Sequence, residues 1–235
     1  MIEKQKACLP CPAGRRAAGR GCWIAFEGND GCGKSDQCKR FAEYLTHDLG
    51  IGPVVETREP GGCFEAEKIK NMLFLPKLAK YPIVQLHLLL AARHLNIFET
   101  VEPSIAMQAI VLQDRSEGST IAYQVFQYGL DYEIARAMND FATAGWRPDL
   151  TMLLDVDEKV GWQRKHASKE GASNYFDNAD FTDLQNRRKG YLWQAKNYKK
   201  LDLNPWVVID ANRPKDEVFK DVVAAVKKSG LIRGI

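Results

Sequence analysis

The segment from Gly28 to Ser35 holds the residues whose types and spacing most clearly predict chemistry. Its sequence, Gly-Asn-Asp-Gly-Cys-Gly-Lys-Ser, matches the G-x-x-x-x-G-K-[ST] pattern of a phosphate-binding loop, or P-loop. Glycines let backbone N–H groups turn toward phosphate oxygens, while the lysine bridges the outer phosphates and the serine ligates Mg²⁺. We therefore predict that ATP and Mg²⁺ bind at Gly28, Asn29, Asp30, Gly31, Cys32, Gly33, Lys34 and Ser35.

Two arginines are also candidate functional residues. Arg115 follows Asp114 at the carboxyl end of a predicted strand, the edge at which α/β sheets bind ligands. A guanidinium there can hold a phosphate through two hydrogen bonds, although an ion pair that ties a loop to a helix is the structural alternative. Arg93 lies within a nearly apolar helix, where a charge is costly to bury without a partner. A polar group must therefore meet Arg93.

The elements that must position these residues alternate between short apolar runs and longer helical patterns, which predicts an α/β fold. We expect a P-loop NTPase-type, doubly wound parallel sheet of five strands with helices on both faces. The predicted strands span residues 22–27, 53–57, 109–113, 150–156 and 206–209. The predicted helices span 33–49, 83–101, a stretch that starts at 181, and 214–228, and the second of these is apolar enough that we expect it to be largely buried.

The polar stretch 166–178 has no helical periodicity and predicts a mobile flap, so we place a lid at about 164–178. The chain of 235 residues fits one domain. Residues 1–21 hold five basic side chains against one acidic side chain, which predicts a basic, disordered N-terminal extension before a catalytic domain at 22–235. The rest of the chain is near neutral, so charge gives no reason to expect a nucleic-acid partner.

No apolar run is long enough for a membrane span, and the N-terminus lacks the apolar core of a secretory signal. We therefore expect a cytoplasmic protein without a membrane partner. The six cysteines lie within the first 63 residues and predict reduced thiols. Cys8 and Cys11 form a C-x-x-C pair, but further zinc ligands at suitable spacing are missing.

Several segments together resemble the thymidylate kinases. They are Asp30 in the P-loop, Thr-Arg-Glu-Pro-Gly-Gly at 57–62, Leu-Leu-Ala-Ala-Arg at 89–93, Asp-Arg at 114–115 and Ser-Thr-Ile-Ala-Tyr-Gln at 119–124, in the family's order and spacing. Segments 147–151, 154–157 and 209–211 resemble its fourth and fifth strands. The resemblance implies a nucleoside monophosphate kinase that phosphorylates dTMP with ATP and Mg²⁺ in deoxynucleotide synthesis. It also implies a homodimer that has small nucleotides as its other partners.

The resemblance implies roles for individual residues. Arg115 would clamp the acceptor phosphate, Asp114 would join Ser35 in the Mg²⁺ network, and Arg93 would donate a hydrogen bond to a thymine carbonyl. Asp30 would help to position Mg²⁺ and the acceptor. Leu89 stands where the family usually has a phenylalanine stacked on the base. The remaining acceptor residues implied by these motifs are Glu59, Pro60, Thr120, Tyr123 and Gln124, although a buried core tyrosine is an equally ordinary interpretation of Tyr123.

Phosphoryl transfer requires positive charge around the migrating phosphate. One branch of the family places an arginine in the P-loop where this chain has Gly31, and another branch supplies it from the lid. The resemblance therefore implies the lid, yet Asn174 and Tyr175 replace the usual Asp-Arg pair. We predict that Arg164 supplies the cation, with Lys165 and Lys169 as alternatives, and that Lys34, Asp30 and Arg115 complete the catalytic set.

Two other functions remain open from the sequence. Leu89, Ser116 and Val125 depart from the family pattern around the acceptor and favour a kinase for another or a modified pyrimidine deoxynucleotide. Asp36, a carboxylate near the phosphates, and Tyr175 suggest a nucleotide-binding protein with little catalysis. Four charged residues argue against a site that has lost its catalytic activity, namely Lys34, Arg93, Asp114 and Arg115.

Overall fold

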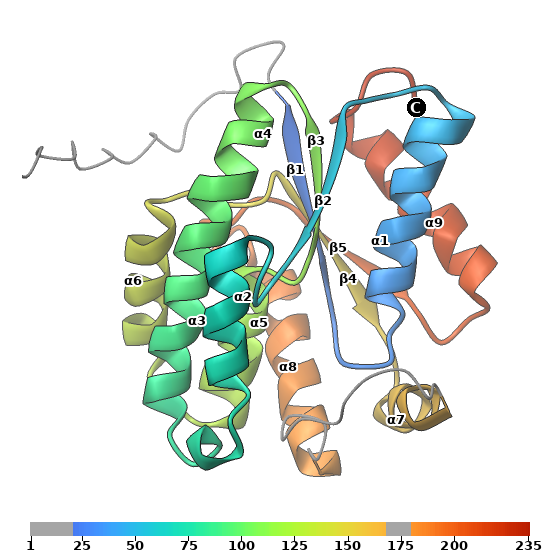
Figure 1. Cartoon of the computed structure of the whole chain (residues 1–235). Coiled ribbons are helices and arrows are strands. Elements are labelled where there is room, and N and C mark those ends of the chain that lie inside the picture. The colour runs from blue at the N-terminus through green and yellow to red at the C-terminus, as the bar shows by residue number, and fades with distance from the viewer. Residues whose placement is uncertain (1–20, 168–179) are drawn as a thin grey trace, which may run out of the picture.

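The computed structural model describes residues 21–167 and 180–235, and within these residues five parallel strands form one sheet. The strand order is β2-β3-β1-β4-β5, which confirms the predicted parallel sheet (Figure 1). Strand order reverses beside β1, so the carboxyl ends of β1, β3 and β4 form the edge where doubly wound sheets bind ligands. The strands are β1 (Cys22–Glu27), β2 (Val54–Arg58), β3 (Ile110–Asp114), β4 (Leu150–Asp155) and β5 (Trp206–Asp210).

Helices cover both faces of the sheet (Figure 1). One layer consists of α1 (Lys34–Glu43) and α9 (Lys215–Ser229). The other consists of α2 (Phe64–Leu73), α3 (Pro82–Asn96), α4 (Glu102–Ala106), α5 (Glu117–Thr120), α6 (Tyr132–Thr143) and α8 (Phe181–Asn197). Helix α7 (Glu158–Ala167) lies near the loop between β1 and α1. Shorter helical turns are η1 (Tyr44–Asp48), η2 (Pro76–Leu78), η3 (Ile97–Val101) and η4 (Ile121–Gln127).

Strand β1 is buried along its whole length because both helical layers cover it. Its alternate side chains enter two cores. Ile24 and Phe26 pack in the core that also contains Phe41 of α1 and Val222 of α9. Trp23 points to the other layer and packs with residues of η3 and α4. The central strand is thus fixed from both sides, and the loop that follows it starts from a rigid position.

The predicted elements form with small shifts at their ends. Strands β2 and β3 begin one residue later than predicted, and α9 spans 215–229. Helix α7 continues to Ala167, so residues 164–167, the first residues of the predicted lid, are helical. The physical reason is that Arg, Lys and Ala favour a helix, and no glycine follows Gly161 until position 171. The remainder of the predicted lid, residues 168–178, and the basic extension 1–20 lie outside the described residues.

The expectation that the helix at 83–101 is largely buried was wrong. Helices α2 and α6 pack against α3, and η3 enters the core, yet Ile83 is 60% exposed and Val84 is 41% exposed. Apolar composition predicts that a helix packs against other elements, but it does not determine how many faces of the helix the same chain buries. None of the helices in the described residues is long and apolar enough to cross a membrane.

Candidate active site

The P-loop joins the end of β1 to the start of α1 and packs directly on α7. Gly31 has a φ of +76°, and a Cβ at this position would lie 2.0 Å from the carbonyl oxygen of Gly161. Both the backbone conformation and the close contact therefore require glycine. The Nδ2 of Asn29 donates a hydrogen bond to the carbonyl of Leu184 at 2.9 Å, which anchors the loop to α8.

The P-loop borders a cavity of about 730 Å³, which we call the donor cavity. Lys34 begins α1, and its Nζ lies 3.5 Å from the carbonyl oxygen of Asn29, within the turn of the loop. Arg164 and Lys165 of α7 line the same cavity from the opposite side. Of the predicted phosphate-binding residues, Gly28 and Asn29 do not line it. Those that do are Asp30, Gly31, Cys32, Gly33, Lys34 and Ser35.

Ser35 and Asp114 lie together at the start of α1 and the end of β3. The Ser35 hydroxyl donates a hydrogen bond to Oδ2 of Asp114. The other carboxylate oxygen, Oδ1, is buried and has no hydrogen-bond partner among the described residues. A hydroxyl beside a carboxylate with an unused oxygen is a donor set that suits Mg²⁺, which takes few protein ligands and completes its shell with phosphate and water. The residues therefore fit the predicted metal.

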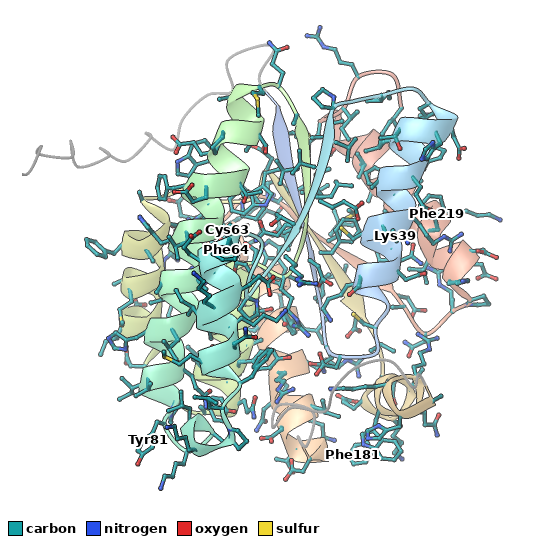
Figure 2. All side chains as sticks on the ribbon, in the orientation of Figure 1. Lys39, Cys63, Phe64, Tyr81, Phe181 and Phe219 are labelled. Atoms are coloured by element: carbon teal, nitrogen blue, oxygen red, sulfur yellow. The ribbon has the colours of Figure 1, made fainter. Side chains whose placement is uncertain are left out.

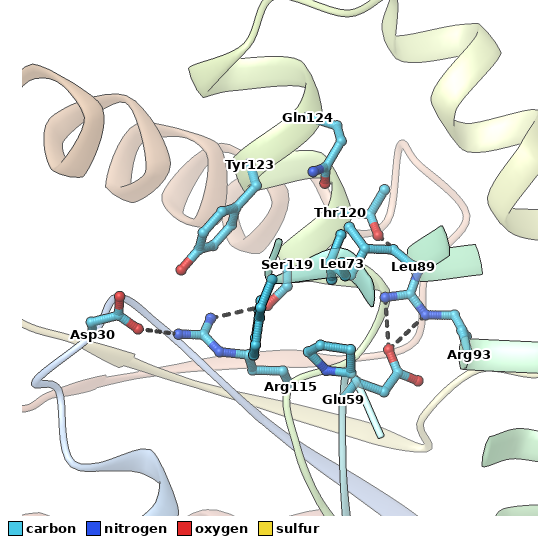
Figure 3. A pocket seen from close by; sticks show the side chains of 12 residues that line it. Asp30, Glu59, Leu73, Leu89, Arg93, Arg115, Ser119, Thr120, Tyr123 and Gln124 are labelled. Atoms are coloured by element: carbon cyan, nitrogen blue, oxygen red, sulfur yellow. Dashed lines mark hydrogen bonds and ion pairs between the residues drawn. The ribbon is translucent and has the colours of Figure 1, made fainter. Parts of the chain in front are cut away.

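A second cavity, of about 130 Å³, lies between the sheet edge and helices α2, α3 and η4, and we call it the acceptor cavity (Figure 3). Leu73 and Leu89 give it an apolar wall, while Arg93 and Arg115 lie at its charged ends. The structure thus brings together around one cavity all the residues that the sequence assigned to the acceptor, namely Glu59, Pro60, Leu89, Arg93, Arg115, Thr120, Tyr123 and Gln124.

Arg115 points from the end of β3 toward the P-loop. Its φ of +68° is unfavourable for a residue with a Cβ, by roughly 1–2 kcal/mol, and redirects the chain directly after the strand. The guanidinium contacts Oδ1 of Asp30 at 2.5 Å and donates to the Ser119 hydroxyl at 3.2 Å (Figure 3). It also donates to the Tyr191 hydroxyl at 3.0 Å. The strained turn thereby places a fixed cation between the two cavities.

Asp30 lines both cavities, and cationic side chains surround its carboxylate. Besides Arg115, its carboxylate lies 3.0 Å from Nζ of Lys165, 3.8 Å from Nη1 of Arg187 and 3.9 Å from Nζ of Lys34. Burial by itself raises the pKa of Asp30, but these cations, Arg115 first, hold it well below its usual range. One carboxylate neutralises only part of this charge, so the junction of the cavities suits a phosphate-bearing ligand.

Arg93 has the polar partners that its burial requires. Its Nε donates to Oε2 of Glu59 at 2.7 Å, and its Nη1 donates to the Thr120 hydroxyl at 2.8 Å and to Oδ1 of Asn139. Its Nη2 donates to the carbonyl of Ser116 at 3.0 Å. The expectation of a polar partner is confirmed, and the Glu59–Pro60 peptide beside it is cis. Because each guanidinium nitrogen already has a protein acceptor, Arg93 is held rigidly at the cavity wall.

Gln124 of η4 is the unsatisfied polar group of the acceptor cavity. Its side chain is fully buried, and neither its amide nitrogen nor its amide oxygen has a hydrogen-bond partner among the described residues. Leaving both ends of a buried amide unpaired costs free energy of about 1–3 kcal/mol or more. Gln124 also lines the cavity, so a ligand that occupies it can satisfy both ends.

Arg164 and Lys165 take different directions from α7. Arg164 donates to the carbonyl oxygens of Ala211 at 2.6 Å and Asn212 at 3.1 Å, on the loop that follows β5. Lys165 instead reaches Asp30. The structure therefore places the predicted Arg164 at the donor cavity, whereas Lys165 stands at the junction of the cavities.

The sequence interpretation missed Arg187 of α8. This side chain is fully buried, and its guanidinium lies 4.1 Å from the ring centre of Tyr123. Position 187 follows Leu184 by three residues and precedes Tyr191 by four, so it falls on the buried face of the helix. The argument used for Arg93, that a charge on an apolar helix face requires a polar partner, would also have identified Arg187. The sequence also missed Leu73, Phe74 and Ser119 at the acceptor cavity.

Comparison with known proteins identifies the family of the chain. The sequence model of the family described as thymidylate kinase matches residues 26–222. The thymidylate kinase of Geotalea daltonii is 37% identical over 212 residues, covering 88% of this chain and 96% of that protein. The thymidylate kinase of Geobacillus sp. (strain WCH70) is 35% identical over 208 residues, covering 88% and 96%. The crystal structure of thymidylate kinase from Ehrlichia chaffeensis superposes with a TM-score of 0.67 at 29% identity, covering 88% of this chain and 99% of that one. The chain belongs to the thymidylate kinase family.

Proposed function

We propose that this protein transfers the terminal phosphoryl group of ATP to dTMP, forming dTDP for deoxynucleotide synthesis. The observation that carries the proposal is that the donor and acceptor cavities meet at Asp30, among several cations. A donor phosphate on the P-loop and an acceptor phosphate beside Arg115 would face each other there. Membership of the thymidylate kinase family supports the choice of reaction.

The base of the acceptor is recognised by Gln124. A thymine or uracil edge presents an N–H donor beside carbonyl acceptors, and a side-chain amide can accept from the first and donate to the second. These are the two groups that Gln124 leaves unpaired. Leu73 and Leu89 supply the apolar contact for the faces of the ring. The nitrogens of Arg93 already donate to protein acceptors. Its guanidinium therefore places a fixed positive charge beside a carbonyl of the base.

The residues of the chain promote transfer chiefly by alignment and by positive charge. Lys34 holds the outer phosphates of ATP, and Arg115 holds the acceptor phosphate. Lys165, at the junction of the cavities, supplies positive charge to the migrating phosphoryl group, while Arg164 supports the donor side. Ser35 and Asp114 would hold Mg²⁺, which would neutralise phosphate charge when bound.

A coupled ADP-release assay with ATP and Mg²⁺ tests the function across ribo- and deoxynucleoside monophosphates. We expect the highest kcat/KM with dTMP. Higher activity on another pyrimidine deoxynucleotide would support the second candidate, which Leu89 favours because it offers no aromatic face to the base. Retained ATP binding without transfer to any acceptor would overturn the proposal in favour of a nucleotide-binding protein.

The active form is a homodimer that pairs through the layer of α2, α3 and α6. Besides Ile83 and Val84, this layer exposes Met72 to 52% and Ile134 to 62%, and exposed apolar groups in one layer are typical of an interface. We expect light scattering at micromolar concentration to give twice the chain mass, and Ile83→Glu to give the single mass. A monomeric wild-type protein would contradict this assembly. The cytoplasmic location stays a prediction from the sequence.

A further inference from the structure

Arg93 is held not only by residues of the acceptor cavity but also from behind it. Asn139 of α6 is buried and does not line the acceptor cavity, yet its Oδ1 accepts a hydrogen bond from Nη1 of Arg93. Behind Asn139 lies Glu117, whose Oε2 accepts a hydrogen bond from Nδ2 of Asn139 at 3.1 Å. Asn139 therefore bridges a cation at the cavity wall and a carboxylate outside the cavity that is 12% exposed.

The direction of the Asn139 amide follows from the charges at its two ends. Its oxygen faces the guanidinium of Arg93 and its NH₂ group faces the carboxylate of Glu117. The reversed amide would bring donor against donor at one end and acceptor against acceptor at the other. Without Glu117, nothing at the far end would favour the direction in which Asn139 accepts from Arg93.

Glu117 is costly to keep as a carboxylate. It is on α5, beside Thr120, the other acceptor for Nη1 of Arg93. Its Oε2 lies 3.6 Å from Nε of Arg147, which also contacts Asp140. Burial raises the pKa of Glu117 to about 6, although Arg147 and Arg93 act in the opposite direction. A largely buried carboxylate whose charge is only partly compensated is a stability cost that calls for a role in the site.

We propose that Glu117 and Asn139 form a hydrogen-bonded relay that fixes the direction of the Arg93 guanidinium, and that Glu117 is thereby a positioning residue for the acceptor base. The inference rests on the proposed function, since it assigns Arg93 to the base pocket. Arg93 lines the acceptor cavity and not the donor cavity. A loosened relay must therefore affect the acceptor nucleotide and leave ATP binding unchanged.

The test compares two substitutions at Glu117 in the full-length protein, at a pH well above 6. Glu117→Gln keeps an oxygen that accepts from Asn139, so we expect an acceptor KM within about threefold of wild type. Glu117→Met has similar length but no acceptor, and we expect it to raise the KM for dTMP about tenfold with the KM for ATP unchanged. The difference between these two variants separates the hydrogen bond from the packing.

Asp140→Asn is the matched control, because Asp140 contacts Arg147 at 2.5 Å but has no contact with the Asn139 side chain in the described structure. We expect this variant to keep the wild-type KM for dTMP. Equal increases in Asp140→Asn and Glu117→Met would overturn the relay, since they would show a general loss of the Arg147 cluster. An unchanged KM for dTMP in Glu117→Met would also overturn the relay.

If Glu117→Met does not fold, Asn139→Ser decides the question, because serine is too short to bridge Arg93 and Glu117. It should raise the KM for dTMP with the KM for ATP unchanged, and an unchanged KM for dTMP would again overturn the relay. Failure of the proposed function would look different. The wild-type protein would then prefer another acceptor or none, and the relay would be tested by the KM or the dissociation constant of the nucleotide that it does bind.

Discussion

Replacing Arg115 by alanine should remove the cation that joins the acceptor phosphate to the junction of the two cavities. The side chain is only 15% exposed and contacts Asp30 at 2.5 Å and the Tyr191 hydroxyl at 3.0 Å. Hydrogen bonds to charged groups are worth about 1.5–3 kcal/mol each, and two bonds from one guanidinium do not add fully, so losing a two-pronged phosphate contact should cost about 2–4 kcal/mol of transition-state stabilisation. That corresponds to a fall of about 30- to 1,000-fold in kcat/KM for dTMP.

Steady-state kinetics with each substrate varied in turn would measure this effect. We expect the KM for dTMP to rise and kcat to fall, while the KM for ATP stays near wild type, because Arg115 lines the acceptor cavity and not the donor cavity. Arg115→Lys should lie between wild type and Arg115→Ala, since it keeps a charge but loses the planar fork.

Arg40→Ala is the control for loss of an arginine in general. Arg40 pairs with Asp216 across α1 and α9 at 2.7 Å and lines neither cavity, so its loss should change kcat/KM by less than about threefold. A change in the KM for ATP alone in Arg115→Ala would move Arg115 to the donor side and refute the assignment. A near-normal kcat/KM would show that the acceptor phosphate binds elsewhere.

Three further predictions follow from the same geometry. Lys34→Ala should abolish transfer while circular dichroism stays that of wild type, because Lys34 lies in the turn of the P-loop; near-normal turnover would contradict the donor site. Leu89→Phe should lower the KM for dTMP by up to about tenfold if the cavity has room, since an aromatic contact adds roughly 0.5–1.5 kcal/mol; no change for any acceptor would place residue 89 away from the base. The pKa of Glu117 is about 6 in the folded protein against 4.5 for an ordinary glutamate, so the folded state binds this proton more tightly and loses stability as pH rises between these values. The unfolding free energy of wild type relative to Glu117→Gln should therefore fall by roughly 2 kcal/mol from below pH 4.5 to above pH 6 in urea titrations, and a pH-independent difference would refute the shifted pKa.

The sequence by itself determined the elements whose patterns are local. The P-loop between a strand and a helix is such a pattern, because glycines, Lys34 and Ser35 act through the backbone of one short segment. Apolar runs of strand length gave the parallel sheet for the same reason. The acceptor residues came from several distant segments, and they were found because their motifs resemble those of a known family.

Only the tertiary structure decided which cationic side chains lie close together at Asp30. Arg164 and Lys165 are neighbours in the sequence, yet one contacts the loop after β5 and the other contacts Asp30, because successive helical residues point about 100° apart. Arg187 joins the same carboxylate from α8, more than 150 residues along the chain from Asp30. The contacts of Asn139 and Glu117 with Arg93 likewise need three elements to pack together. Such contacts depend on the distances between packed helices and strands, which a linear pattern of residue types does not contain.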